Sequence, residues 1–374
     1  MRPWLGPEEA QAAADAVASG WVAQGPRVAA FERAVAEAVG AGDGVAVSSC
    51  TTGLHLALVV AEVAQGDEVI VPSLSFIATA NVVRYTGARP VFADVDLATG
   101  NLTADTIGEV MTARTRAVIL VHQGGVPADI EVIHRLCDAR GVLVIEDAAC
   151  AIGARYHGEP IGGHSDLVAF SFHPRKVITT GEGGMVCTPR SDWAARLRRL
   201  REHGMSVSAS DRHASSSVVL EEYVETGFNY RMTDVQAAIG IVQLGRLEEI
   251  VARRRALAAR YHDALADIDG LALVADPSWG TTNFQSFWGL LPEDFPVSRN
   301  ELLQQLLDVG VSARRGIMAS HREPAYAQEP HGPLPNTERL TDGSIILPMF
   351  HDMTEHDQDR VVEALHGAAR VGRP

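Results

Sequence analysis

The chain has 374 residues, of which 46% are hydrophobic and 21% are charged, and its formal net charge is -15. This length supports a large core and two domains, and the composition is that of an ordinary globular enzyme. The negative charge argues against a phosphate-backbone partner, and the longest basic run is only Arg253-Arg254-Arg255. We therefore expect no nucleic-acid binding, although a nucleotide-sized ligand needs only a local site.

Short apolar runs alternate with amphipathic stretches through the first two-thirds of the chain. Candidate strands lie at 44–48, 68–71, 90–95, 117–121, 142–146 and 167–172. Candidate helices between them include 53–64, 130–140 and 193–202. Continuous Val/Ile-rich strands separated by helices predict an α/β fold with a mostly parallel sheet buried on both faces. Ligands of such sheets bind at the carboxyl ends of the strands.

The pattern changes after residue 234. Thr233 or Asp234 is a candidate cap for a long helix that runs to about residue 266. Candidate strands at 271–274 and 284–291 and candidate helices at 299–309 and 355–369 follow it. The segment 318–341, rich in Pro, His and Glu, is typical of a functional or bridging loop. We predict a large domain at 1–240 and a smaller α+β domain at 241–374.

The cysteines indicate the compartment. Cys50, Cys137, Cys150 and Cys187 form no CxxC pair and have no histidine at metal-ligand spacing, which is typical of reduced, buried thiols. No apolar signal region begins the chain, and no run approaches membrane-spanning length. We expect a cytoplasmic protein with no membrane partner and no metal.

Lys176 stands in the run 171–184, between a candidate strand and a stretch of glycines and small hydroxyl residues. A lysine on a loop at the end of a buried strand has little reason to be there for packing. When partly desolvated, its amine loses affinity for a proton and becomes a nucleophile able to form a Schiff base with an aldehyde. The alternative is an ordinary surface lysine in a Gly-rich turn.

Three other features bear on that choice. Asp147 follows the strand 142–146, where an acid can face a ligand or cap the next segment. The run 48–53, Ser-Ser-Cys-Thr-Thr-Gly, can cradle a phosphate at a helix start or simply cap the helix. Phe76 follows a strand end and can cover a planar ring or join the core. Together with Lys176, these are the groups that pyridoxal 5'-phosphate (PLP) requires. No G-x-G-x-x-G follows a strand and no GxxxxGK[ST] occurs, so dinucleotide and NTP-hydrolase functions lose their main support.

On these residues the chain resembles the DegT/StrS-type family of PLP-dependent sugar aminotransferases, which have the fold-type I (aspartate aminotransferase-like) architecture. The resemblance covers essentially the whole chain, in blocks at 19–26, 49–55, 72–81, 146–153, 171–184 and 227–238. It implies a large domain with a mostly parallel, seven-stranded sheet between helices, and a smaller C-terminal α+β domain.

The resemblance also implies roles for individual residues. Lys176 becomes the lysine that binds the cofactor and Asp147 the partner of the pyridine nitrogen, with Phe76 stacked on the ring. The residues expected to hold the phosphate are Thr51, Thr52 and Ser171. Asn229 would reach the phosphate of the neighbouring subunit's cofactor, which implies a homodimer with shared active sites; the alternative for Asn229 is a turn residue before a helix.

Cys150 departs from the family pattern, which commonly has Gln or His there to contact the phenolic oxygen of the cofactor or the substrate. Cysteine is a poor hydrogen-bond donor, so we expect altered tuning of the cofactor without loss of catalysis. The residues expected near the substrate are Trp21, Arg231, Arg314 and His321. For Arg314 and His321, the alternative is a solvated loop.

The activity implied by the resemblance is transfer of an amino group from L-glutamate (or glutamine) to a keto-sugar, typically nucleotide-linked, in amino-sugar, antibiotic or polysaccharide biosynthesis. Lys176 would move the substrate proton, and Asp147 would keep the pyridine nitrogen protonated. Relatives that act on keto-cyclitols, build aminobenzoate units or dehydrate sugars stay open as alternatives, and so does a non-catalytic regulator. The presence of Lys176 argues against the dehydratases in which a histidine replaces it.

Overall fold

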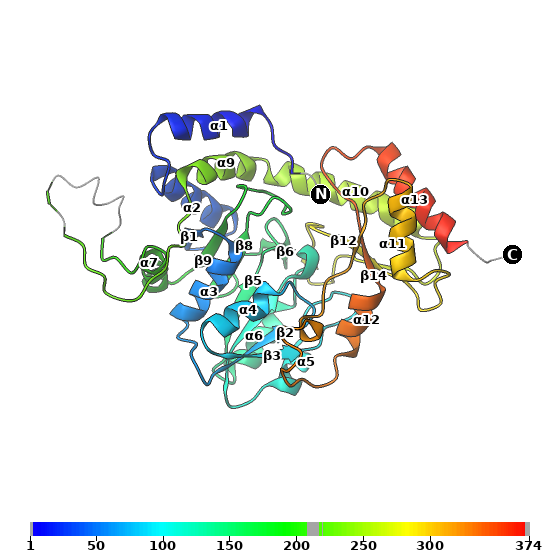
Figure 1. Ribbon diagram of the computed structural model, residues 1–374, viewed down its shortest axis with the longest axis horizontal. Helices are drawn as coiled ribbons and strands as arrows, with labels where there is room; N and C mark the ends of the chain where they lie inside the picture. The colour runs from blue at the N-terminus through cyan, green and yellow to red at the C-terminus, as the bar shows by residue number, and fades with distance from the viewer. Residues whose placement is uncertain (1–2, 208–216, 219, 371–374) are drawn as a thin grey trace.

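The structure, a computed structural model, describes residues 3–207, 217–218 and 220–370. Its centre is a seven-stranded sheet in the order β1-β9-β8-β5-β4-β2-β3 (Figure 1). The strands are β1 Asp43–Val47, β2 Glu68–Pro72, β3 Arg89–Ala93, β4 Thr115–Val121, β5 Leu143–Asp147, β8 Leu167–Ser171 and β9 Gly184–Thr188. The pairings within β3-β2-β4-β5-β8 are parallel, which confirms the predicted α/β fold.

Helices cover both faces of this sheet. The helices of this part are α1 Pro7–Ala18, α2 Pro26–Ala38, α3 Cys50–Val60, α4 Ala78–Tyr85, α5 Ala104–Val110, α6 Ile130–Asp138, α7 Ser191–Leu200 and α9 Asp234–Gly245. One core lies between the sheet and α2, α5, α6 and α9, and the other between the sheet and α3, α4 and α7. Within β2, Ile70 enters the first core and Val69 and Val71 the second, so the strand is apolar at consecutive positions.

Strand β9 is the element that the apolar runs did not reveal. It runs antiparallel to both of its neighbours, pairing Asp43 with Thr188 on one side and Ser171 with Gly184 on the other. The chain therefore leaves β8, makes the loop 172–183 and returns beside the same strand. Both ends of the loop that contains Lys176 are thus fixed in the sheet.

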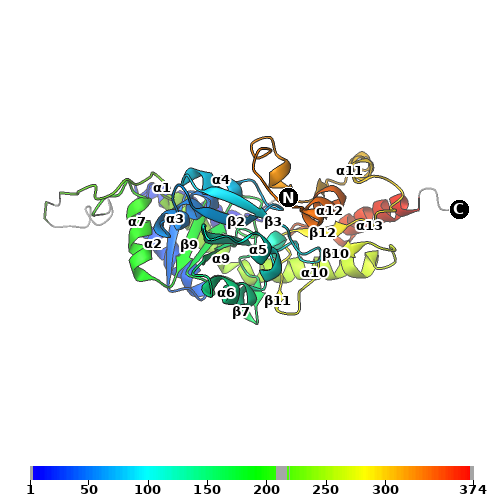
Figure 2. The ribbon, with the colours of Figure 1, turned by 90° about the horizontal axis from the view of Figure 1, so that it is seen from below.

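The last third of the chain forms a smaller sheet flanked by helices, at one end of the molecule (Figure 2). Its elements are α10 Leu247–Leu265, β10 Ala272–Leu273, β12 Phe287–Leu290, α11 Arg299–Asp308, β13 Arg314–Arg315, α12 Pro335–Gly343, β14 Ser344–Leu347 and α13 Glu355–Ala369. Strands β10, β12, β14 and β13 pair antiparallel in that order. A third sheet joins β11 Gly280–Thr281 to β6 Arg155–Tyr156 and β7 Glu159–Pro160. The division into domains at 1–240 and 241–374 stays a prediction.

The helix predicted as one element from 234 to about 266 is two, because the backbone departs from helical geometry at Arg246 (φ -101°, ψ 0°) between α9 and α10. Thr233 is the cap, since its hydroxyl accepts the N–H of Gln236 at 3.2 Å. Asp234 serves another helix: its carboxylate accepts the N–H of Val28 at 2.9 Å, in the first turn of α2. The cap residue of α2, Gly25, has no side chain for this purpose.

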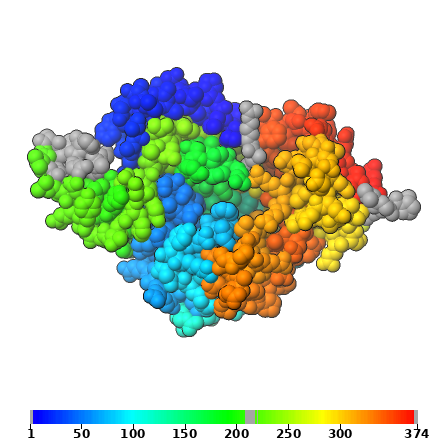
Figure 3. All heavy atoms as spheres, viewed as in Figure 1, coloured from blue at the N-terminus to red at the C-terminus, as the bar shows by residue number. Residues whose placement is uncertain are grey.

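The segment 318–341 lies against the large sheet, as Figure 3 shows for the orange surface beside the cyan one. Ala319 forms a β-bridge with Leu74, just beyond β2, and Asn336 donates its N–H to Asp94 Oδ2 at 3.0 Å, just beyond β3. The segment includes the 3₁₀ turn Ser320–Arg322 and the start of α12. It therefore bridges the two ends of the molecule, as its composition suggested.

Candidate active site

A cavity of about 320 Å³ opens at the carboxyl ends of β4, β5 and β8, where the sequence predicted a ligand. The last residues of these strands, Val121, Asp147 and Ser171, all line it. The remaining lining residues are Ser49, Cys50, Thr51, Leu54, Ser75, Phe76, Ala78, Thr79, Gln123, Ala149, Cys150, His173, Arg175, Lys176 and Glu182. Lys176 and Asp147, the predicted catalytic pair, thus face the same space.

Asp147 is the last residue of β5 and only 6% exposed. Its Oδ1 accepts the N–H of Ala149 at 3.2 Å, and its Oδ2 accepts the hydroxyl of Thr79 at 3.1 Å. Burial raises the pKa of Asp147, while the Ala149 N–H, the Lys176 charge and the Thr79 hydroxyl act in the opposite direction. The carboxyl group is therefore held in one orientation inside the cavity.

Lys176 Nζ lies 3.2 Å from Cys150 Sγ and donates a hydrogen bond to it. The loop is tight around this residue, because the Lys176 N–H donates to the carbonyl of His173 at 2.8 Å. Burial by itself lowers the pKa of Lys176, but the Cys150 contact and the charges of neighbouring groups, Asp147 among them, outweigh it and raise the pKa. The sequence predicted that desolvation would lower the pKa of this amine. That prediction is wrong, because the pKa is raised once the neighbouring groups are included.

A group of hydroxyls surrounds the N-terminus of α3, as the run 48–53 predicted. The helix begins at Cys50, earlier than the predicted residue 53, because Ser49 caps it: the Ser49 hydroxyl accepts the N–H of Thr52 at 3.2 Å. The Thr52 hydroxyl in turn donates to the Ser49 carbonyl at 2.8 Å. Thr51 lines the cavity as predicted, whereas Thr52 is outside the lining and Ser49 contributes there instead.

Gly184, the first residue of β9, lets this helix start approach the lysine loop. A Cβ on Gly184 would lie 2.5 Å from the carbonyl carbon of Ser49 and 2.6 Å from the nitrogen of Cys50. Such distances exclude every side chain. The glycine therefore allows the hydroxyl cluster and the Lys176 loop to share one wall of the cavity.

The structure brings together most of the predicted cofactor residues. Phe76 lines the cavity with 66% of its side chain exposed, Ser171 lines it at the end of β8, and Cys150 lines it beside Lys176. Asn229 is exposed and outside this lining, where it forms a β-bridge with Glu202.

The predicted substrate residues do not line this cavity. Trp21 lies in the turn between α1 and α2, Arg231 lies just before α9, and Arg314 is exposed on β13. His321 is 5% exposed, and its Nδ1 lies 2.6 Å from the hydroxyl of Ser73. That contact fastens the segment 318–341 to the end of β2.

Several lining residues were not found by sequence reasoning. Ser75 and Thr79 sit within the block 72–81: Ser75 lies in the turn before α4 and Thr79 in the first turn of that helix, and their hydroxyl oxygens are 2.8 Å apart. His173 and Arg175 shortly precede Lys176 within the run 171–184. Each of these residues could have been predicted from the sequence, because each lies within a few positions of Phe76 or Lys176.

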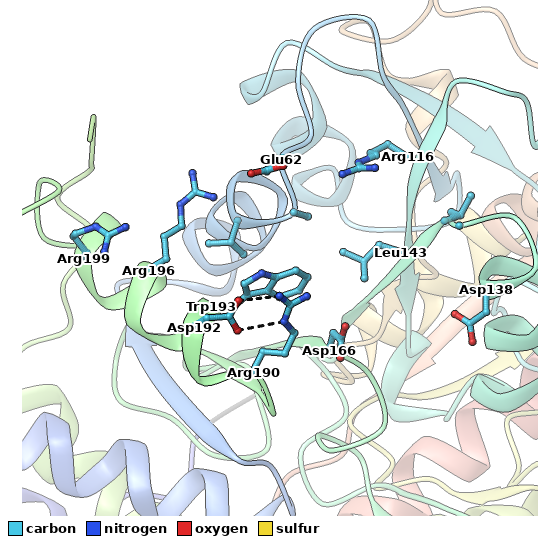
Figure 4. Close-up of a pocket in the computed structure, with 14 residues that line it drawn as sticks. Glu62, Arg116, Asp138, Leu143, Asp166, Arg190, Asp192, Trp193, Arg196 and Arg199 are labelled. Carbon is cyan, nitrogen blue, oxygen red and sulfur yellow. Dashed lines mark hydrogen bonds and ion pairs between the residues drawn. The ribbon is translucent and has the colours of Figure 1, made fainter. Parts of the chain in front are cut away.

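A second cavity, larger at about 800 Å³, lies at the opposite edge of the sheet (Figure 4). Arg116, Leu143 and Asp166 line it at or near the amino ends of β4, β5 and β8. Figure 4 shows Arg190 paired with Asp192, and their closest atoms are 2.8 Å apart. Its size exceeds that of the first cavity, but it contains neither Lys176 nor Asp147 and lies away from the carboxyl ends of the strands.

Residues 3–366 match the model of the DegT/DnrJ/EryC1/StrS aminotransferase family. The chain belongs to this family. The aminotransferase TlmJ from Streptoalloteichus hindustanus is 36% identical over 99% of this chain and 98% of that one, with a TM-score of 0.91. DesI, solved in the presence of its TDP-sugar product, is 32% identical over 100% and 92% of the two chains, with a TM-score of 0.90. The PLP form of Spr1654 from Streptococcus pneumoniae is 24% identical over 99% and 98%, with a TM-score of 0.92, and shares the fold.

The protein is therefore a PLP-dependent sugar aminotransferase of fold type I, and the expectations for family, fold class, enzyme class and cofactor are confirmed. The cavity suits the cofactor. It offers a buried carboxylate for a pyridinium nitrogen, an amine for an aldehyde, and hydroxyls at the N-terminus of an 11-residue helix for a phosphate. No group of three potential metal ligands occurs among the described residues, and no helix in that part is long and apolar enough to cross a membrane.

Proposed function

We propose that this aminotransferase moves the amino group of L-glutamate to a nucleotide-linked keto-sugar in the biosynthesis of an amino sugar. The observation that carries the proposal is the pair of the half-buried Lys176 and the buried Asp147, which face one cavity beside a hydroxyl-rich helix start. A relative at 32% identity, DesI, was solved with a TDP-sugar product, which supports a nucleotide-linked acceptor here.

The roles of the lining residues follow from their chemistry. Asp147 would hold the pyridine nitrogen, Phe76 the ring face, and Ser49, Thr51 and Ser171 the phosphate. The cofactor supplies, when bound, a sink for the electron pair left behind when a substrate C–H bond loses its proton. Asp147, a buried carboxylate fixed by Thr79 and Ala149, would hold a proton at the ring nitrogen.

Lys176 is proposed as the group that moves the substrate proton. Its amine must first be free of its own proton to accept one from the donor Cα. The raised pKa makes it a strong base once deprotonated, and Cys150 Sγ, 3.2 Å away, is a resting contact for Nζ. In the second half-reaction the same amine would deliver a proton to the carbon of the keto-sugar that receives the amino group.

We also propose a homodimer in which Asn229 of the partner subunit completes each site. Asn229 is exposed and outside the cavity of its own chain, so a role at a cofactor requires a second copy. Apolar side chains in the segment that precedes it in the sequence are exposed as well: Val218 is 90%, Leu220 85% and Tyr223 64% exposed. Side chains of this kind favour burial against another subunit.

The cysteines support a cytoplasmic setting for the proposed reaction. All four are free, and Cys50, Cys137 and Cys187 are buried. Thiols persist in this state where the surroundings are reducing.

The experiment is a difference spectrum of the PLP-loaded protein as L-glutamate is added and then removed. We expect the band of the bound cofactor to convert to the pyridoxamine form and to return when a nucleotide-linked keto-sugar is added. The Lys176→Ala variant should bind the cofactor without a borohydride-reducible bond and should lose activity by several orders of magnitude.

Three results would count against parts of the proposal. A wild-type spectrum unchanged by L-glutamate and by glutamine would reject the donor. A panel in which keto-cyclitols, and not nucleotide-linked keto-sugars, restore the original band would reject the acceptor. A borohydride-reducible bond that persists in Lys176→Ala would reject Lys176 as the attachment point.

A further inference from the structure

Arg175 directly precedes Lys176 and lines the same cavity. Its backbone is fixed on both sides: the N–H donates to His173 Nδ1 at 3.1 Å, and the carbonyl accepts Gln285 Nε2 at 2.7 Å. The side chain is nevertheless exposed. The backbone of Arg175 is thus held in place, while its guanidinium can contact a ligand at the rim of the cavity.

The guanidinium of Arg175 has no ion pair or hydrogen bond within the described ranges, in contrast to many other exposed arginines. Arg84 pairs with Glu329 at 2.6 Å and Arg190 with Asp192 at 2.8 Å. The other unpaired arginines of that part, such as Arg140, lie away from this cavity. Arg175 is therefore an unpaired cation at the site where a substrate must enter.

The other charged side chains at this rim do not satisfy Arg175. Glu182 lines the same cavity, but its Oε1 faces His173 Nε2 at 3.8 Å. His173 has a lowered pKa, first because of burial and then because of the positive charges of Arg175 and Lys176, with Glu182 acting in the opposite direction. A mostly neutral His173 leaves the positive charge at the rim with Arg175 and Lys176.

We propose that Arg175 is a specificity-determining residue that binds an anionic oxygen group of the substrate through paired N–H donors. A guanidinium matches a carboxylate or a phosphate in this way, and a lysine does not. The two sources of such a group are the side-chain carboxylate of the amino donor and the diphosphate of the acceptor. The inference rests on the proposed function, which supplies both substrates.

Anion binding to the PLP-loaded protein tests the assignment without turnover. Glutarate imitates the donor and inorganic pyrophosphate imitates the acceptor, while the bound cofactor occupies the phosphate-binding hydroxyls. Calorimetry should give a dissociation constant at least about tenfold weaker for one of the two anions in Arg175→Gln, the loss expected for one charge-assisted contact. The anion that loses affinity identifies the source.

Two matched variants control for charge and for geometry. Arg140→Gln removes the same charge from an exposed arginine outside the cavity and should bind both anions as wild type does. Arg175→Lys keeps the charge but removes the paired donors. Its affinity for the anion should therefore fall between that of wild type and that of Arg175→Gln. In Arg175→Gln, the half-reaction with the substrate that carries this anionic group should show a raised KM, while kcat and the cofactor spectrum stay unchanged.

Dissociation constants within twofold of wild type for both anions in Arg175→Gln would overturn the proposal, and so would a wild-type protein that binds neither anion. These results differ from a failure of the proposed function. A protein that ignores L-glutamate in the difference spectrum but loses anion affinity in Arg175→Gln would reject the donor and retain the role of Arg175.

Discussion

The two oxygens of the Asp147 carboxylate have different partners. Oδ1 accepts the Ala149 N–H, and Oδ2 accepts the hydroxyl of Thr79. Because Thr79 gives its single proton to Asp147, the 2.8 Å contact between Ser75 Oγ and Thr79 Oγ1 must have Ser75 as its donor. A short relay of two hydroxyls, from Ser75 just before α4 and Thr79 in its first turn, therefore orients the carboxylate.

We predict that Thr79→Val, which keeps the shape and removes the donor, lowers kcat/KM by about tenfold, the value of one hydrogen bond to a charged group. The Thr79 hydroxyl lowers the pKa of Asp147, so its loss should raise that pKa further. The acid limb of the pH–rate profile should then move to higher pH.

The control for this prediction is Thr86→Val, at the other end of the same helix, where the hydroxyl donates to the carbonyl of Val83. Thr86→Val should leave the acid limb of the pH–rate profile at the wild-type pH. An acid limb that stays unmoved in Thr79→Val would remove Thr79 from the positioning of Asp147.

At the scale of residues, sequence reasoning found the chemistry but not every partner. Lys176 and Asp147 were singled out from their residue types at strand ends, Thr51 and Ser171 were implied by the family resemblance, and all four face one cavity. Thr52 was not distinguishable from its neighbours, because spacing alone does not tell which hydroxyl of a capping box is consumed by the helix. His321 looked free in a Pro-rich segment, and only the fold brings Ser73 to its ring.

Among the elements, the amino ends of β2, β3 and β4 are held by one buried carboxylate, Glu68. Its side chain accepts hydrogen bonds from Arg89 Nη2 at 2.7 Å, Thr112 Oγ1 at 2.6 Å and Arg114 Nε at 2.9 Å. Burial by itself raises the pKa of Glu68, but these hydrogen bonds outweigh it and lower the pKa to about 2. The ionised form is therefore the one that stabilises the sheet.

We predict that Glu68→Gln lowers the thermal midpoint at neutral pH, with a loss of about 2 kcal/mol in the free energy of unfolding. Because the folded pKa is depressed, the contribution of Glu68 is fully present above its unfolded value and is lost as the pH falls toward about 2. The gap in midpoint between wild type and variant, measured by calorimetry at successive pH values, should close in that window.

An exposed ion pair provides the comparison. Glu131 pairs with Arg135, but both side chains are more than 60% exposed, at 62% and 63%. Glu131→Gln should change the midpoint little at any pH, since exposed pairs contribute about 0–1 kcal/mol. A gap for Glu68→Gln that stays constant down to acid pH would show that its ionisation is not what stabilises the sheet.

The elements that could be predicted were those with an apolar signature of their own. The parallel strands appeared as Val/Ile-rich runs, because both faces of each are buried. Strand β9 starts with Gly184 because of a close approach to α3, a contact between distant segments that leaves no local pattern. The break at Arg246 did have a local signal, since it directly follows Gly245, the last residue of α9.

For the whole molecule, the proposed shared site makes a prediction about mixed dimers. A heterodimer of one Lys176→Ala subunit and one Asn229→Ala subunit contains one site with both defects and one with neither. If Asn229 serves the partner's cofactor, this heterodimer should have about half of wild-type activity, although each parent homodimer is impaired.

The measurement uses coexpressed subunits with different affinity tags, so that only heterodimers are assayed. Activity no higher than that of the Asn229→Ala homodimer would mean that Asn229 acts within its own chain or not at the site. A protein that sediments as a monomer at assay concentrations would reject the shared site altogether.

The strand order also sets a sequence of events during translation. Among the residues that the structure describes, strand β1 pairs only with β9, the Ser48 N–H donates to the carbonyl of Tyr230, and Asp234 caps α2. The first fifty residues emerge from the ribosome first but have no sheet partner until residues 184–188 are made. A nascent chain that ends before β9 therefore lacks the fixed helix start beside Lys176, and cofactor capture has to wait until about half of the polypeptide has been synthesised.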